Sequence, residues 1–331
     1  MENIRTKWDF DNPLSDLSPK DNSWDAHRLD TQKVQNFYVQ DTEFQKYAER
    51  LGGCSTLLKF APVITDDKAG LKLKYAFFCR VRHCPVCQWR RSMLWRARMF
   101  SILPKILEEH QGGRWLFLTL TVKNCPITEL RDTLQDMNKA WNRLRLRKEF
   151  KHIIGWIRTT EVTRNAKDGT AHPHFHALLL VKPSYFKGQN YIKQTRWREL
   201  WQETAQLDYD PFVHVQAVKA GIGQDALSKA VCETLKYSVK PSDLVQDAGW
   251  FLELTRQTHK LRFIATGGVL KGCLASVEDA TNEEMLVTGA EEESTDTADN
   301  GVRLAFGWQS EQRRYYHRPD LDENANDDDG G

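Results

Sequence analysis

The sequence predicts an α+β fold, in which helices pack against one face of a sheet. Strand-like segments and segments with a helical spacing of apolar residues alternate imperfectly along the 331 residues. Two of the strands are separated only by the turn-forming residues 165–169, which predicts a hairpin. Apolar residues make up 40% of the chain, enough for a packed core. Hairpinned strands mixed with crossing helices favour an α+β sheet whose second face stays available for a binding site.

The predicted elements follow one another between two ends of low structural content. In chain order they are a cysteine-rich module with a basic helix (about 50–110), a strand (115–122), a helix after Pro126, strands from 153 and through 172–181, a helix (193–206), a strand (212–218) and a helix (224–239). The expected domains are a flexible segment (1–49), the cysteine-rich module (50–110), a catalytic domain (111–275) and an acidic tail (276–331).

Charge is distributed very unevenly along the chain. The formal net charge is only +2, from 47 basic and 45 acidic residues. Residues 278–331 contain 16 acidic and 4 basic residues, a net charge of −12, which leaves +14 on residues 1–277. The tail is therefore expected to be largely disordered, with an ordered island over 303–316 whose apolar side chains pack on the body. No apolar run approaches the roughly 20 residues of a membrane span, so the expected location is the cytoplasm.

Three histidines, at positions 172, 174 and 176, precede the apolar run 177–181. Because alternate residues of a strand share a face, His172, His174 and His176 line one side of it. Imidazole is the commonest side-chain ligand of divalent transition metals, and this spacing leaves coordination positions open. The alternative is a strand end with merely solvated rings. The role of His172 stays undecided: it could be a metal ligand, a partner of a ligand or a phosphate contact. Pro173 restricts the segment to an edge strand or a strand start.

Glu161 is the candidate third metal ligand. It lies in the strand-like segment 153–163, which the turn 165–169 joins to the histidine strand, and hairpin partners lie side by side. A carboxylate facing the histidines would add a hard oxygen ligand, which suits Mg²⁺ or Mn²⁺. The alternative partner of Glu161 is a cross-strand arginine such as Arg158.

A second set of reactive residues lies in the helix predicted over 224–239. Glu233 and Tyr237 are four residues apart and would share a face, with Tyr237 as nucleophile and Glu233 as general base at one phosphate. Lys236 and Lys240 add cations that contact phosphate or stabilise the phenolate. A surface pair of glutamate and tyrosine is the ordinary alternative.

The cysteines predict a structural zinc site. Cys79, Cys84 and Cys87 lie within nine residues, and Cys54 or His83 is the candidate fourth ligand. Disulfides are the alternative, but seven cysteines is an odd number and the chain has no predicted signal peptide.

The region around the cysteines is strongly basic. Between residues 68 and 107 there are ten lysines and arginines and no acidic residue, which predicts a contact with DNA phosphates. The candidate DNA-binding residues are Arg80, Arg82, Arg90, Arg91, Arg96 and Arg98. A solvated basic face is the alternative.

The chain resembles the replication initiators of rolling-circle plasmids, which are HUH endonucleases. The resemblance lies in three segments and their order: the strand 117–121, then the histidine segment 172–176, then the segment 233–237. The resemblance spans roughly residues 50–275 and includes the cysteine cluster. It implies a central antiparallel sheet in which strand 117–121 is central and supports the histidine strand. It also implies that His174 and His176 bind Mg²⁺ or Mn²⁺.

The same resemblance implies how the reaction proceeds. Tyr237 would attack one DNA strand at the origin, leaving a 5′-phosphotyrosine link and a free 3′-hydroxyl that a host polymerase extends. Glu233 would activate water for the terminating cleavage, as in the branch with a single tyrosine. The implied partners are origin DNA, single-stranded at the nick, and a host helicase. The competing interpretations are a non-catalytic, zinc-containing DNA-binding regulator and a single-tyrosine transposase or relaxase.

Overall fold

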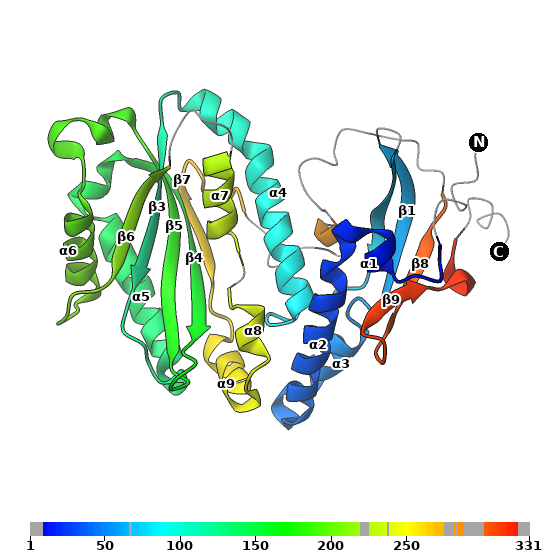
Figure 1. The fold of residues 1–331 in the computed structure, drawn as a ribbon. Coiled ribbons are helices and arrows are strands. Elements are labelled where there is room, and N and C mark those ends of the chain that lie inside the picture. The colour runs from blue at the N-terminus through cyan, green and yellow to red at the C-terminus, as the bar shows by residue number, and fades with distance from the viewer. Residues whose placement is uncertain are drawn as a thin grey trace. The chain divides into compact units, whose positions relative to one another are not determined.

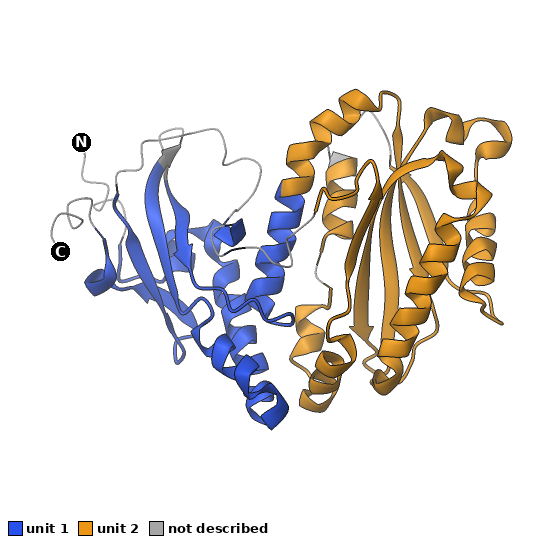
Figure 2. Ribbon diagram, turned by 180° about the vertical axis from the view of Figure 1, so that it is seen from behind, with its two compact units in different colours: residues 1–97, 277–331 blue, residues 98–276 orange. Residues whose placement is uncertain are grey.

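A computed structural model describes residues 9–65, 68–218, 225–236, 238–274, 281, 284–286 and 301–323. The chain forms two compact units (Figure 2). The first combines residues 1–97 with residues 277–331, and the second comprises residues 98–276. The two ends of the chain, which the sequence places in separate segments, therefore share one unit. Each unit has its own antiparallel sheet.

The first unit packs helices beside a four-stranded sheet with the order β2-β1-β8-β9 (Figure 1). Its elements are α1 (Leu14–Leu17), α2 (Ser23–Val39), α3 (Gln45–Gly53), β1 (Leu57–Thr65), β2 (Lys68–Ala76), the start of α4 (Pro85–Glu109), β8 (Leu304–Gln309) and β9 (Arg314–His317). Strand β1 pairs with β8 in antiparallel register, with Leu57 opposite Gly307 and Phe60 opposite Leu304. The predicted ordered island over 303–316 is thus confirmed, and Leu304 and Phe306 are fully buried.

The prediction that the N-terminal segment is flexible is wrong for the described residues from 9 onward. Helix α2 buries Trp24, Val34 and Tyr38, and these side chains form part of the core of the first unit. The ring of Tyr38 lies 5.5 Å from that of Phe44, which leads into α3. Burial of several large apolar side chains offsets the conformational entropy of ordering this segment.

The second unit has a five-stranded sheet with the order β6-β3-β5-β4-β7, and every neighbouring pair is antiparallel. Its elements are the rest of α4, β3 (Arg114–Thr121), α5 (Leu130–Arg145), β4 (Ile153–Arg164), β5 (Ala171–Val181), α6 (Gln194–Ala205), β6 (Val213–Val218), α7 (Asp225–Thr234), α8 (Pro241–Leu244), α9 (Ala248–Thr258) and β7 (Ile264–Gly268). The strands and helices predicted between 115 and 218 are confirmed, and the α+β class with them.

Helices cover both faces of this sheet, so the expectation of helices on one face is wrong. On one face, the ring of Phe175 in β5 lies 6.4 Å from Trp141 of α5 and 6.1 Å from Trp201 of α6. On the other face, the Thr159 hydroxyl of β4 donates a hydrogen bond of 2.8 Å to the carbonyl of Thr234 in α7. This bond places the end of α7 over the histidine face.

The same contact explains why α7 stops early. The helix ends at Thr234, not at residue 239, because the Thr159 hydroxyl binds its last carbonyl and the chain then turns toward β4. There the Val162 N–H donates to the Ser238 carbonyl at 3.0 Å. A helix that continues to residue 239 is therefore wrong. Tyr237 lies outside the described residues, so its position relative to Glu233 stays a prediction.

The histidine strand β5 is itself the centre of the sheet, with β3 on one side and β4 on the other. An edge position for the histidine strand is therefore wrong. Strand β3, which contains 117–121, lies inside the sheet between β6 and β5, so the expectation that it is central and supports the histidine strand is confirmed. Pro173 is the third residue of β5, opposite Val162, so the alternative of a strand start is the correct one.

Candidate functional site

The strand register gathers polar side chains around the histidines of β5. His174 pairs with Glu161 of β4 and with Thr121 of β3, and His176 pairs with Thr159 and Thr119 on the same two strands. Because directly paired residues of antiparallel strands point to the same side, this face carries a polar patch across three strands. Phe175, between the histidines, points to the opposite face and is fully buried.

The Glu161 carboxylate joins the two histidines. Its Oε2 lies 3.1 Å from Nε2 of His174 and 3.0 Å from Nε2 of His176, within hydrogen-bond distance of both rings. The three ligand atoms lie within 4.8 Å of one another, and all three residues are buried. The strand register thus brings Glu161 to the histidine pair, as expected.

Arg158, the alternative partner of Glu161, lies on the other face of β4. Its Nη1 donates to Oδ1 of Asn138 in α5 at 2.7 Å, and its guanidinium lies 4.1 Å from the centre of the Phe175 ring. Neighbouring residues of a strand alternate between faces, so an arginine three positions from Glu161 cannot reach it. A cross-strand pair of Arg158 with Glu161 is therefore wrong.

The second nitrogen of each imidazole also has a partner. Nδ1 of His176 lies 3.2 Å from the Thr119 hydroxyl, and Nδ1 of His174 can donate to the His172 carbonyl at 3.3 Å. Partners of this kind fix ring orientation and favour the tautomer whose Nε2 lone pair is free for a metal. Two imidazoles and one carboxylate, each held in place, fit a divalent cation that keeps open positions.

Burial and charge set the protonation states at this cluster. Burial raises the pKa of Glu161, but hydrogen bonds from the two histidines and the ammonium of Lys236 outweigh it and hold that pKa well below its usual range. Burial lowers the pKa of His176, against the pull of Glu161. At neutral pH the cluster therefore presents an ionised carboxylate and a neutral imidazole, the forms that bind metal ions.

His172 stands beside this cluster but outside the three-residue group. Its ring stacks on that of His174, with 5.1 Å between ring centres. Burial lowers the pKa of His172, and the charge of His174 acts in the same direction. Its carbonyl supports His174, so the alternative that fits this geometry is a partner of a ligand.

Lys236 connects the metal-type cluster with the segment that follows α7. Its Nζ lies 3.0 Å from Oε2 of Glu161 and 2.6 Å from Oε1 of Glu233. Glu233 is half exposed at the end of α7. Lys240 is exposed and its carbonyl accepts the first hydrogen bonds of α8. The structure thus brings Lys236 and Glu233 to the histidine face.

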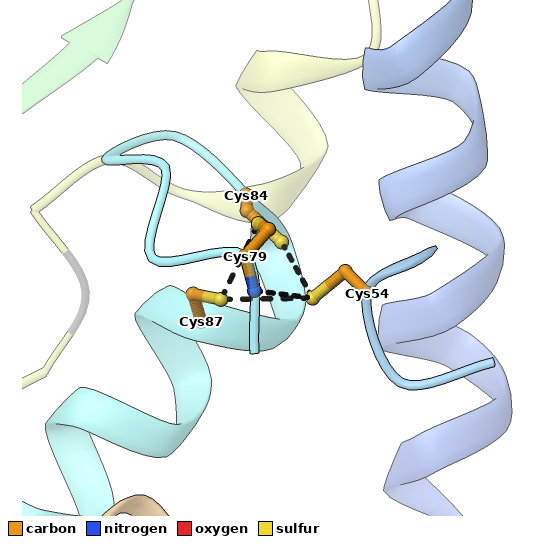
Figure 3. Close-up of side chains that lie close together, drawn as sticks. All are labelled: Cys54, Cys79, Cys84 and Cys87. Atoms are coloured by element: carbon orange, nitrogen blue, oxygen red, sulfur yellow. Dashed lines mark hydrogen bonds between the residues drawn. The ribbon is translucent and has the colours of Figure 1, made fainter. Parts of the chain in front are cut away.

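A second group, formed by four buried cysteines, lies in the first unit (Figure 3). Cys54 follows α3, Cys79 follows β2, and Cys84 and Cys87 flank the start of α4. The sulfur of Cys54 is 3.6 Å from those of Cys84 and Cys87, and Cys79 is 3.6 Å from Cys87. The group does not include His83, so Cys54 is the fourth member.

These distances fit a tetrahedral zinc site. Zn–S bonds of about 2.3 Å in a tetrahedron separate the sulfurs by about 3.8 Å. A disulfide needs about 2.05 Å, so the cysteines of this group are free thiols. Burial raises the pKa of both Cys54 and Cys79, so a cation is needed to hold them as thiolates.

Of the six candidate DNA-binding arginines, Arg90 is turned inward. It is only 1% exposed, its Nε donates to the Met285 carbonyl at 2.8 Å, and its guanidinium packs over the rings of Trp24 and Trp89. A DNA contact through Arg90 is therefore wrong, because the side chain is committed to the core of the first unit.

Arg91 supports the cysteine loop. Its guanidinium donates to the carbonyls of Cys87, Val81 and Arg82 at 3.0–3.1 Å. Arg50, which the sequence did not single out, donates in the same way to the Cys79 carbonyl. The remaining candidates reach the surface to different degrees: Arg80 is exposed, and Arg82, Arg96 and Arg98 are partly exposed.

Within the described part of the chain, every helix is too short or too polar to traverse a lipid bilayer.

Known proteins match most of this chain. The sequence model of a family described as "Replication protein" matches residues 70–316. "Protein rep" from Streptococcus pneumoniae serotype 2 is 33% identical over 303 residues, which cover 90% of this chain and 92% of that protein. "Protein rep" from Lactiplantibacillus plantarum is 36% identical over 297 residues, with coverage of 84% and 90%. A "Replication protein" from Staphylococcus aureus is 34% identical over 226 residues, with coverage of 65% and 95%. No solved structure matches the chain.

Proposed function

Because this chain belongs to the replication protein family of plasmid replication initiators, we propose that it starts rolling-circle replication by cutting one strand of the origin as an HUH endonuclease. Tyr237 is the nucleophile, a divalent cation assists it, and Glu233 activates the water of the terminating cleavage. One observation carries this proposal. Lys236 bridges Glu161, the partner of both histidines, and Glu233, so residues of the β4–β5 hairpin and of the distant α7 segment meet at one place on the sheet.

The residues that would hold the cation are Glu161, His174 and His176. Their ligand atoms converge, and the carboxylate supplies the hard oxygen that Mg²⁺ or Mn²⁺ prefers. When bound, such an ion polarises a phosphoryl oxygen and offsets the negative charge that develops in the transition state.

The cutting step exchanges one phosphate ester for another. The phenol oxygen of Tyr237 forms a bond to phosphorus as the bond from phosphorus to the 3′-oxygen breaks. The phenol proton goes to solvent or a nearby base, and the departing 3′-oxygen gains a proton. The products are a 5′-phosphotyrosine link and a 3′-hydroxyl, which a host polymerase extends while a helicase opens the duplex. The ammonium of Lys236 contributes positive charge beside the reacting phosphate.

Termination uses water in place of a second tyrosine. Glu233 accepts a proton from a water molecule, whose oxygen attacks the phosphorus of the regenerated origin and displaces the 3′-oxygen. The free 3′-hydroxyl then attacks the phosphotyrosine, which releases Tyr237 and joins the strand. Lys236, at 2.6 Å from Glu233, holds that carboxylate at the site.

The four cysteines would hold a structural Zn²⁺ that fixes the fold of the first unit. Arg80, Arg82, Arg96 and Arg98 are the remaining candidates for contacts with origin DNA phosphates.

The experiment that tests this function looks for a covalent product. The purified protein is incubated with a degenerate pool of labelled single-stranded DNA and Mn²⁺, and the products are separated on a denaturing gel. A labelled adduct that requires Mn²⁺ and disappears with EDTA is expected, and its DNA identifies the nick sequence. Tight DNA binding without an adduct, at full metal loading, would instead indicate a non-catalytic regulator.

Glu161→Gln is expected to weaken Mn²⁺ binding at least about tenfold, because the variant loses the charged oxygen ligand. Isothermal titration calorimetry at pH 7 measures the affinity directly, without DNA. Glu149→Gln is the control, since Glu149 is a partly buried carboxylate of the same unit that pairs with Arg196 at 2.8 Å and lies outside the Glu161 group. An unchanged affinity in Glu161→Gln would show that the histidines alone hold the ion.

Glu233→Gln is expected to form the adduct at the normal rate but to slow the water-dependent terminating cleavage at least about 100-fold, the usual contribution of a general base. A substrate with two origin sequences in tandem separates the two steps. Glu199→Gln is the control, because Glu199 is similarly exposed and pairs with Arg196 three residues earlier, as Glu233 pairs with Lys236. Equal loss of both steps would assign Glu233 a role in metal or DNA binding.

A further inference from the structure

Edge strand β6 and the residue before it, Phe212, carry a row of exposed side chains that the proposed chemistry does not use. Phe212 is 66% exposed although it is a large apolar residue, and His214 and Gln216 are exposed as well. Val213, between Phe212 and His214, is buried. The alternation shows that the exposed residues share one face and that Val213 faces the core.

This row continues the face that carries Glu161 and the histidines. In the register of β3, Thr119 pairs with His176 on one side and with His214 on the other. One step along, Thr121 pairs with His174 and bonds through its N–H and hydroxyl to the Phe212 carbonyl, at 3.2 and 2.9 Å. Strands are about 4.8 Å apart, so the row lies about 10 Å from the histidine strand.

The opposite flank of the site is occupied by the segment that contains the proposed nucleophile. Lys236 reaches Glu161 of β4, and the Ser238 carbonyl accepts a hydrogen bond from Val162 of β4. The two residues that adjoin Tyr237 in the chain therefore lie beside β4. The edge strand β6 lies on the other side of the histidines (Figure 1).

In-line displacement gives these two flanks different roles. The attacking and leaving oxygens lie on opposite sides of the phosphorus. Because Lys236 and Ser238 lie on the β4 flank, an attack from that flank directs the leaving 3′-oxygen toward β3 and β6. We infer that Phe212 and His214 form a stacking platform for the nucleotides on the 5′ side of the nick, which carry the new 3′-hydroxyl. This inference rests on the proposed function and adds a substrate subsite to it.

The chemistry of the row favours bases over phosphates. Aromatic rings stack on the faces of unpaired bases with little dependence on sequence. The nearby loop mixes charges: Lys123 lies over the ring of Tyr209 at 4.1 Å, Asp208 is exposed, and Asp210 pairs with Arg198 at 3.6 Å. Such a mixed surface does not attract a phosphate backbone, so the occupant of the row is single-stranded DNA held through its bases.

The test uses two oligonucleotides defined by the nick that the wild-type adduct identifies. One oligonucleotide ends in the 3′-hydroxyl at the nick, and the other begins with the 5′-phosphate and continues on the 3′ side of the nick. Fluorescence anisotropy with Mn²⁺ measures both affinities. Phe212→Ala is expected to bind the 3′-hydroxyl oligonucleotide about tenfold more weakly, with the other unchanged. His214→Ala is expected to act in the same direction.

Leu146→Ala is the matched control, because Leu146 is a large apolar residue, 87% exposed, at the end of α5. Circular dichroism checks that each variant is folded. If the adduct forms but Phe212→Ala weakens both oligonucleotides equally, or neither, the platform is wrong while the proposed function stands. If the wild type forms no adduct at all, the proposed function fails and the inference fails with it.

Discussion

Tyr237→Phe is expected to abolish the covalent adduct completely while leaving the affinity for single-stranded DNA within about twofold of the wild type. The substitution removes only the phenol oxygen, so no ester to the 5′-phosphate can form. The aromatic ring is retained. The measurement is the adduct assay with Mn²⁺, run beside an anisotropy measurement of DNA binding. This separation of binding from cutting is what a tyrosine nucleophile requires and what a regulator would not show.

Tyr191→Phe is the control for this substitution. Tyr191 lies in the same unit and is 49% exposed, and its ring packs against Tyr185 and Phe186. It is expected to form the adduct as the wild type does. An adduct that persists in Tyr237→Phe would assign the nucleophile to another residue and would remove the premise of the in-line argument for β6.

The histidine site was predictable from sequence because its determinants are local. Alternation along β5 places His174 and His176 on one face, and the short turn at 165–169 brings β4 alongside in a hairpin. Glu161 follows from the register of that hairpin. Its link through Lys236 to Glu233 did not follow, because the helix ends where the Thr159 hydroxyl captures a carbonyl. Such an ending depends on a tertiary contact.

The first unit was harder to predict, for two physical reasons. Helix α2 buries Arg28 and Thr31 together with Trp24, Val34 and Tyr38, so polar residues interrupt the apolar stripe that marks an amphipathic helix. Arg28 is accommodated because its guanidinium donates to the carbonyls of Leu51 and Gly52 at the end of α3. A composition typical of a flexible segment therefore belongs to a helix with one buried face.

Long-range pairing is the second reason. Strand β1 lies between β2, its neighbour in sequence, and β8, about 250 residues later. The sequences of β1 and β8 do not reveal that the two strands pair, because the pairing of distant strands depends on how their apolar faces pack in the core. The basic residues show the same dependence: Arg90 has the sequence context of a DNA contact, yet it is buried against Trp24 and Trp89.

The cysteine group ties these distant pieces together. Cys54 follows α3, and the adjacent Ser55 carbonyl accepts a hydrogen bond of 2.7 Å from the hydroxyl of Tyr315 in β9. Thr31 of α2 lies 3.6 Å from the sulfur of Cys84, at the start of α4. Three helices and a strand from the C-terminal part of the chain thus meet at or beside the four sulfurs.

Cys54→Ser is therefore expected to lose the zinc and to unfold much of the first unit. Zinc binding to such a group contributes about 10–16 kcal/mol at pH 7, which is comparable to the whole stability of a typical domain. The measurements are metal content by mass spectrometry and hydrogen exchange of α2, α3 and the start of α4. Removal of zinc from the wild type by a strong chelator is expected to give the same exchange pattern.

Cys125→Ser is the control that separates the loss of zinc from the loss of a buried thiol in general. Cys125 is also buried but lies in the second unit, outside the four-cysteine group. Its variant is expected to keep one zinc per chain and normal protection of α2. If Cys54→Ser also keeps one zinc per chain, three cysteines and another donor suffice, and the fourth ligand must be sought elsewhere. If zinc is lost but protection of α2 remains, apolar packing by Trp24 and Tyr38 alone holds the unit together, and the metal serves another purpose.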